Sequence, residues 1–132
     1  MSVNVNFKDK VVWITGASSG IGRALAFEFS RRGYALGLSA RRLELLESLR
    51  DELGRETQVA IAKLDVADLE RVPEVLHKLA EELGGVQIVI ANAGIGERSY
   101  PGEGTFHLDS KVIEINVLGA MATIDAGTEI LK

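Results

Sequence analysis

The chain has 132 residues, with 15 Lys and Arg against 19 Asp and Glu, which gives a net charge of −4 at pH 7. That length suits one domain with a single core. The acidic balance argues against nucleic-acid binding, because affinity for phosphate backbones rests on cationic contacts. The absence of cysteine excludes disulfides and thiolate metal sites and is consistent with a cytoplasmic protein.

Neither a membrane span nor secretion is expected. No apolar run approaches the roughly 18 residues that a membrane helix needs, and residues 1–10 lack the basic-then-apolar pattern of a signal peptide. His77 and His107 stand alone, without a partner at ligand spacing, so the sequence predicts no metal site.

Short apolar runs alternate with longer amphipathic segments along the chain. The runs predict strands at residues 11–15, 35–39, 58–64 and 87–91. The first amphipathic segment places Ile21, Leu25 and Phe29 on one helical face and ends near Arg32, with Gly33 as its C′ residue. Further helices are predicted at residues 42–53, 68–83 and 108–131.

Three positions affect the ends and continuity of these helices. Asp68 is the expected N-cap of the third helix. Pro73 fits only in the first turn of a helix, so the alternative is a regular helix that starts near the proline. Gly119 and Gly127 are expected to interrupt the last helix.

The element order is β-α-β-α-β-α-β-α, with strands that are apolar throughout. Such strands belong to a parallel sheet covered on both faces, and right-handed crossovers then give a doubly wound, Rossmann-like α/β fold in the strand order 3-2-1-4. Residues 1–132 are expected to form one dinucleotide-binding domain that stops after the fourth strand and its helix. Ligands bind such sheets at the carboxyl ends of the strands.

The first predicted strand runs into a glycine-rich turn. It reads Thr15-Gly16-Ala17-Ser18-Ser19-Gly20-Ile21-Gly22. Glycines let a diphosphate approach the backbone, and the following helix N-terminus offers free N–H groups and a positive dipole end. A tight turn that binds nothing is the alternative, but three glycines at this strand–helix junction favour a dinucleotide site. No Lys followed by Ser or Thr comes after the glycines, which excludes a P-loop.

Arg41 and Arg42 follow the second predicted strand. At this point an acidic residue takes the ribose hydroxyls of NAD, whereas an arginine accommodates the 2′-phosphate of NADP. Solvated charge is the alternative, but cations oppose the dipole at a helix N-terminus. The pair, and Arg41 above all, therefore predicts NADP.

Polar residues also follow the third and fourth strands. Asp65, before Val66, could accept from an adenine amino group or only shape the turn. The tripeptide Asn92-Ala93-Gly94 leaves room for a ribose, and its amide can tie neighbouring strand ends together. Asn116 lies among apolar helical residues, where an amide is more often a satisfied core residue that bends the helix.

Four motifs, spread over essentially the whole chain, resemble in type and order those of the classical short-chain dehydrogenases/reductases (SDR). They are Thr15-Gly16-x-x-x-Gly20-Ile21-Gly22, Asp65-Val66, Asn92-Ala93-Gly94 and Asn116-Val117. The resemblance implies an NADP(H)-dependent oxidoreductase that transfers hydride between nicotinamide and a carbonyl or secondary alcohol. It implies that Asp65 and Val66 contact adenine, that Asn92, Ala93 and Gly94 line the cofactor ribose, and that the catalytic Asn116 holds a water in the proton relay. It also implies a homo-oligomer, because in this family the last helix packs against its dimer mate. The candidate cofactor-binding residues are Gly16, Ser18, Ser19, Gly20, Ile21, Gly22, Arg41, Arg42, Asp65, Val66, Asn92, Ala93 and Gly94.

The chain departs from the family pattern in two respects. The other catalytic residues of the family are a Ser and a Tyr with a Lys four positions on, but Tyr34 is followed there by Leu38 and Tyr100 by Gly104. Ser19 stands where NADP-dependent relatives often carry a basic residue, so phosphate recognition leans on the two arginines and on the hydroxyls of Ser18 or Ser19.

We therefore expect the N-terminal, cofactor-binding part of such an enzyme, inactive by itself. A non-catalytic module that binds a dinucleotide or a protein partner is the alternative. A methyltransferase is disfavoured, because its ribose contact after the second strand should be acidic.

Overall fold

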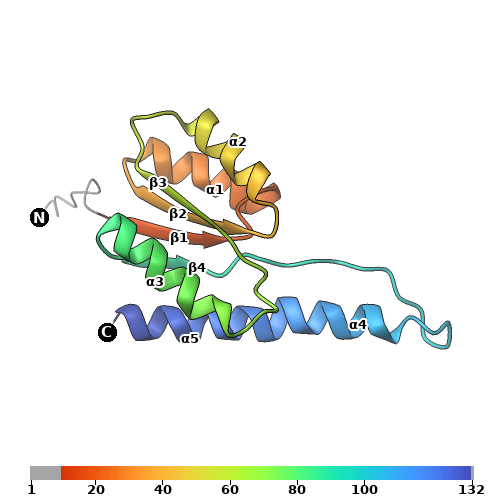
Figure 1. Cartoon of the computed structure of the whole chain (residues 1–132). Coiled ribbons are helices and arrows are strands. Elements are labelled where there is room, and N and C mark those ends of the chain that lie inside the picture. The colour runs from red at the N-terminus through yellow and green to blue at the C-terminus, as the bar shows by residue number, and fades with distance from the viewer. Residues whose placement is uncertain (1–9, 132) are drawn as a thin grey trace, which may run out of the picture.

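The structure is a computed structural model that describes residues 10–131. Its centre is a parallel four-stranded sheet in the order β3-β2-β1-β4 (Figure 1). The strands are β1 (Val11–Thr15), β2 (Ala35–Ala40), β3 (Val59–Lys63) and β4 (Ile88–Ile90). The helices are α1 (Gly20–Arg31), α2 (Leu43–Leu53), α3 (Arg71–Leu83), α4 (Phe106–Ile113) and α5 (Ala120–Leu131), with a π-helical segment, η2 (Glu114–Gly119), between the last two. The predicted doubly wound α/β fold and its strand order are confirmed.

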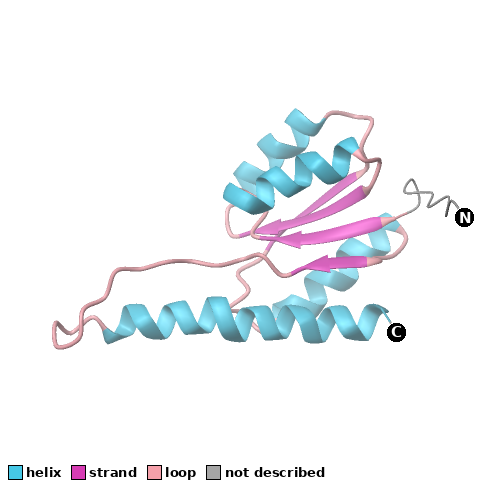
Figure 2. Cartoon of the chain, turned by 180° about the vertical axis from the view of Figure 1, so that it is seen from behind, coloured by secondary structure: helices cyan, strands magenta, loops and turns pink. Residues whose placement is uncertain are grey.

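Helices cover both faces of the sheet (Figure 2). One buried cluster, which includes Ile14 and Leu38, packs under α1 and α2, and a second, which includes Trp13, packs against α3 and α5. All five residues of β1 are buried, because the strand lies between two neighbours and two helical layers. The strand β4 is only half-buried, since it forms an edge of this sheet. The sheet thus holds the ends of β1, β2 and β3 in fixed register beside one another.

Glycines terminate the helices where the sequence predicts. Gly33, Gly54 and Gly84 follow α1, α2 and α3 with φ of 88°, 79° and 81°, values that suit glycine. The expected N-cap at Asp68 is wrong, because α3 begins at Arg71 after Glu70. Asp68 is instead held in a turn, where its N–H donates to the Asp65 carbonyl at 3.0 Å. The alternative start near Pro73 is the correct one, since the proline lies in the first turn of α3.

The last helical segment begins at Phe106, two residues earlier than expected, and runs as one rod through η2 to Leu131 (Figure 1). Gly127 does not interrupt it, contrary to expectation. Its role is close packing, because a Cβ at Gly127 would meet Val89 Cγ2 of β4 at 2.9 Å. Gly119, at the end of η2, packs likewise on Val66, which a Cβ would meet at 2.5 Å. Within residues 10–131, no helix has the length and apolar character to span a membrane.

Candidate functional site

A cavity of about 290 Å³ lies at the carboxyl ends of the strands. This is where a doubly wound sheet binds its ligands. Twelve of the predicted cofactor residues line it: Gly16, Ser18, Ser19, Gly20, Ile21, Arg41, Arg42, Asp65, Val66, Asn92, Ala93 and Gly94. Gly22 and Asn116 do not line the cavity but pack against residues that do.

The glycine-rich turn after β1 is held by the neighbouring strands. The Ala17 N–H donates to the Ser39 carbonyl of β2 at 3.1 Å. A Cβ at Gly16 would lie 2.7 Å from Ala93 Cα, and one at Gly22 would lie 2.4 Å from the Gly16 carbonyl oxygen. These two glycines are therefore required by the packing of the protein itself. Gly20 differs, since a Cβ there would meet nothing in the protein, and its φ of 55° and its place on the cavity wall leave the backbone open to a ligand.

The N-terminus of α1 faces the cavity, and no capping side chain accepts a hydrogen bond from its backbone N–H groups. The first N–H groups of a helix have no intrahelical partner, and here the first bond within the helix is from the Arg23 N–H to the Ser19 carbonyl at 3.3 Å. Ser19 makes no side-chain cap, and the first turn contains no acidic residue. A helix end of this kind, with its positive dipole, is suited to bind a phosphate.

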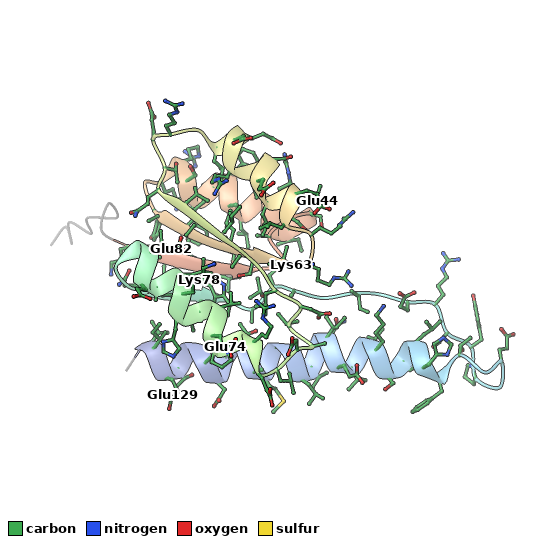
Figure 3. The ribbon with its side chains drawn as sticks, in the orientation of Figure 1. Glu44, Lys63, Glu74, Lys78, Glu82 and Glu129 are labelled. Atoms are coloured by element: carbon green, nitrogen blue, oxygen red, sulfur yellow. The ribbon has the colours of Figure 1, made fainter. Side chains whose placement is uncertain are left out.

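Arg41 and Arg42 lie at the exit of β2, are exposed and line the cavity. Neither forms an ion pair with another residue of the described chain. Lys63, which ends β3 opposite Ala40, adds a third cation at this edge of the sheet (Figure 3). The acidic residue Glu44 lies in the first turn of α2. Lys63 does not line the cavity. Two uncommitted guanidinium groups therefore border the cavity on the side of β2.

Asp65 follows β3 and shapes the next turn, one of the two roles that the sequence left open. Its Oδ1 accepts the Ala67 N–H at 3.0 Å, which shapes the turn before α3. The residue also lines the cavity beside Val66 and is exposed, so its second carboxylate oxygen is available to a ligand amino group.

Thr15 joins the ends of β1 and β4. Its Oγ1 accepts the N–H groups of Asn92 at 3.0 Å and Ala93 at 3.1 Å. In return, the Asn92 side-chain amide donates to the carbonyls of Thr15 at 3.2 Å and Gly16 at 3.3 Å. The amide thus ties two strand ends together, and sequence reasoning assigned no such role to the buried hydroxyl of Thr15.

The Asn116 side chain is used to hold a main-chain segment. Its Nδ2 donates to the Ile95 carbonyl and its Oδ1 accepts the Ile95 N–H, both at 2.8 Å. Asn116 lies within the π-helical segment η2, and such segments often occur at functional sites. The pair of hydrogen bonds fixes the strand-end segment that follows Gly94 against the last helix.

Four apolar residues that the sequence did not single out complete the cavity wall: Ala40, Leu64, Ile95 and Ile115. Each directly adjoins a residue or motif that was singled out, and that adjacency is the only signal they carry. No three His, Asp or Glu side chains come together as a potential metal site within the part of the chain that the structure describes.

The cavity fits a dinucleotide. It offers uncapped helix donors and an open glycine for a diphosphate, a free carboxylate oxygen beside Val66, two cations near β2 and an apolar wall toward Ile95 and Ile115. The polar and apolar groups lie at different parts of one surface, as an elongated ligand with charged and aromatic parts requires.

Comparison with known proteins agrees with this geometry. The chain is similar to an oxidoreductase of Mycobacterium tuberculosis, with 40% identity over 124 residues, which are 92% of this chain and 49% of the relative. It is also similar to Dehydrogenase/reductase SDR family member 7 of Homo sapiens, with 36% identity over 86% of this chain and 35% of the relative. The chain therefore spans half or less of the length of these relatives.

A solved alcohol dehydrogenase from the archaeon Thermococcus sibiricus, in complex with 5-hydroxy-NADP, superposes with a TM-score of 0.87 at 40% identity. The match covers 92% of this chain and 53% of that one. Residues 10–132 match the model of the short chain dehydrogenase family. With the sheet, the glycine-rich turn and the Asn92 junction in place, the chain belongs to the short-chain dehydrogenase family of oxidoreductases.

Proposed function

We propose that this chain is the cofactor-binding half of an NADP(H)-dependent oxidoreductase that transfers hydride between the nicotinamide and a carbonyl or secondary alcohol. The observation that carries the proposal is the pair Arg41 and Arg42, which border the cavity without an ion pair among the described residues. A guanidinium matches a phosphate with paired N–H donors, whereas NAD would call for an acid at this point. The Thermococcus sibiricus enzyme, solved with 5-hydroxy-NADP, supports the same cofactor.

Each part of the cavity then has a task. The N-terminus of α1 and the backbone around Gly20 bind the diphosphate, and Ser18 or Ser19 adds a hydroxyl donor to the 2′-phosphate. Asp65 accepts from the adenine amino group, and the guanidinium groups of Arg41 and Arg42 bind the 2′-phosphate. When bound, the cofactor supplies or accepts hydride at its nicotinamide ring.

The nicotinamide end of the site is formed by the segment from Asn92 to Ile95. We assign to Asn116 the positioning of this segment through Ile95, and this tie also sets the place of Gly94, because a Cβ there would lie 3.3 Å from Asn116 Oδ1. The acid–base Tyr, its Lys and the orienting Ser have no counterpart among the 132 residues, so the proton transfer is assigned to the rest of the enzyme.

Self-association is part of the proposal. An apolar stripe, defined here as Ile113, Val117, Met121 and Ile124, runs along the last helical segment with each side chain exposed. Exposed apolar stripes mark interaction surfaces, so we assign this one to a homo-oligomer. A cytoplasmic location stays a prediction from the cysteine-free sequence.

The test of the cofactor is a calorimetric titration of NADPH and NADH into the protein expressed from its complete coding sequence. A charge-assisted hydrogen bond is worth roughly 1.5–3 kcal/mol, so NADPH should bind at least about tenfold more tightly than NADH. Arg41→Ala should remove most of that preference and leave NADH affinity unchanged.

Lys63→Ala is the matched control. It also removes one cation from this sheet edge, but from a side chain that does not line the cavity (Figure 3). We expect it to retain the NADPH preference. Equal wild-type affinities for the two cofactors, or an equal loss in both variants, would contradict the proposal.

A further inference from the structure

Ser39 is a buried polar residue to which the proposed function gives no task. Only three polar side chains are buried in the described chain, those of Thr15, Ser39 and Thr123. Thr15 joins β1 to β4, and Thr123 donates to the Gly119 carbonyl one helical turn earlier at 2.8 Å. The Ser39 hydroxyl instead accepts the indole N–H of Trp13 at 2.8 Å.

The Trp13 indole crosses from β1 over β2. It lies over Gly37, where a Cβ would be 3.6 Å from Trp13 Cδ1, and it is covered from α3 by Leu79 and Leu83. Both Trp13 and Ser39 are fully buried. A buried indole N–H needs a partner, and a hydrogen bond in such surroundings is costly to leave unmade. The contact therefore fixes where the end of β2 lies relative to β1.

That end of β2 connects three parts of the cavity. The Ser39 carbonyl accepts the N–H of Ala17, the residue before Ser18 and Ser19, at 3.1 Å. The next carbonyl, that of Ala40, accepts the Leu64 N–H at 2.8 Å, directly before Asp65. Arg41 is the next residue of the chain. Ser39 thus holds the glycine-rich turn with its main chain and β1 with its side chain, two residues before the guanidinium.

We propose that Ser39, anchored by Trp13, is a positioning residue that determines cofactor specificity. It holds Arg41 at the distance from Ser18 and Ser19 at which the guanidinium and a serine hydroxyl both reach the 2′-phosphate. This inference rests on the proposed NADP(H) function. The diphosphate needs only the turn and the N-terminus of α1, whereas a 2′-phosphate needs the end of β2 to be correctly placed. Loosening Ser39 should therefore weaken NADPH binding more than NADH binding.

The experiment compares dissociation constants of NADPH and NADH for wild type, Ser39→Ala and Trp13→Phe in the protein expressed from its complete coding sequence. Each variant removes one partner of the hydrogen bond. We expect each to lower the NADPH-to-NADH affinity ratio by about fivefold, a fraction of one charge-assisted contact, while NADH affinity stays within about twofold. The double variant should lower the ratio no further than either single one, because both remove the same contact.

Thr123→Ala is the control, since it removes another buried hydroxyl, which lies in α5 and not in the cavity wall. It should leave the ratio unchanged. A ratio that persists in folded Ser39→Ala or Trp13→Phe, a parallel loss for both cofactors, or an equal effect of Thr123→Ala would overturn the inference. A wild-type protein that binds NADPH no better than NADH would contradict the proposed function and this inference together. A wild-type protein that prefers NADPH, with variants that keep the preference, would contradict only the inference about Ser39.

Discussion

Gly22 and Gly37 are both buried glycines, but the space around them differs. A Cβ at Gly22 would lie 2.4 Å from the Gly16 carbonyl oxygen and 2.6 Å from Asn92 Nδ2, so backbone would have to move. A Cβ at Gly37 would meet only side-chain atoms, at 3.4 Å or more, and its backbone does not require glycine. The first glycine is therefore indispensable and the second is replaceable.

We predict that Gly22→Ala lowers the free energy of unfolding by about 1–3 kcal/mol, the usual cost of overpacking. The same substitution at Gly37 should cost less than about 0.5 kcal/mol or stabilise, because alanine restricts the unfolded chain. Urea denaturation of both variants measures the difference. A tolerated Gly22→Ala would show that the turn can shift away from Asn92.

At this scale the sequence singled out twelve residues that line the cavity but missed some of those that hold them in place. Arg41 and Asp65 are visible because their charges stand out at predicted strand ends. Ser39 and Ile95 are not, because their partners, Trp13 and Asn116, lie 26 and 21 positions away in the chain. Contacts of that range depend on the fold and leave no local pattern.

At the scale of elements, the C-terminal end of α1 carries a charge cluster. Glu28 accepts hydrogen bonds from Arg31 at 2.5 Å and from Arg32 at 2.8 Å. These bonds, first that from Arg31, lower the pKa of Glu28 from 4.5 to about 2. A carboxyl with a depressed folded pKa stabilises the protein above its unfolded pKa, and this contribution is lost as pH falls through the folded value.

Glu28→Gln should therefore have a lower free energy of unfolding than wild type above pH 4.5, and this difference should shrink as the pH falls from 4.5 to about 2. The effect should be small and fall with added salt, because the groups are exposed. Thermal unfolding at a series of pH values measures it, with Glu74→Gln on α3, labelled in Figure 3, as an exposed carboxyl control. A difference that stays constant down to pH 2 would exclude this origin.

The last helical segment shows where element prediction reached its limit. Helical spacing predicted one helix, but η2 arises where Asn116 is tied to Ile95 across the fold, which no helical period encodes. The expected N-cap at Asp68 was wrong for a related reason, since the turn from Asp65 to Asp68 uses the residues that would otherwise cap α3.

The apolar stripe predicts that the 132-residue chain associates with itself at tens of micromolar. Met121 is 62% exposed and Ile124 58%, and burying each such side chain is worth roughly 1.5–3 kcal/mol. The half-buried edge strand β4 offers a second contact for pairing. Light scattering should give a mass above 14.2 kDa for wild type.

Ile124→Glu should shift this association toward the monomer, because it places a charge in the apolar stripe. Asp125→Asn, at an exposed position beside it, should not. A wild-type chain that remains a monodisperse monomer at this concentration would refute the assignment of the stripe.

At the scale of the whole molecule, cofactor binding and proton transfer are assigned to different parts of the enzyme. We predict that the 132 residues alone catalyse no hydride transfer, because neither Tyr34 nor Tyr100 has a lysine four positions on and an asparagine does not donate a proton at neutral pH. An assay of aldehydes, ketones and alcohols with NADP(H), on protein of verified mass, checks this. Reproducible turnover would show that another acid, such as Tyr100, has taken the role.

The central claim is that the protein is an NADP(H)-dependent oxidoreductase. Its most direct test is the rate of hydride transfer from NADPH and from NADH to a panel of aldehydes and ketones, catalysed by the protein expressed from its complete coding sequence. We expect turnover with a kcat/KM for NADPH at least about tenfold above that for NADH, the ratio that one contact to the 2′-phosphate supplies. Equal or faster turnover with NADH, or none with either cofactor, would contradict it.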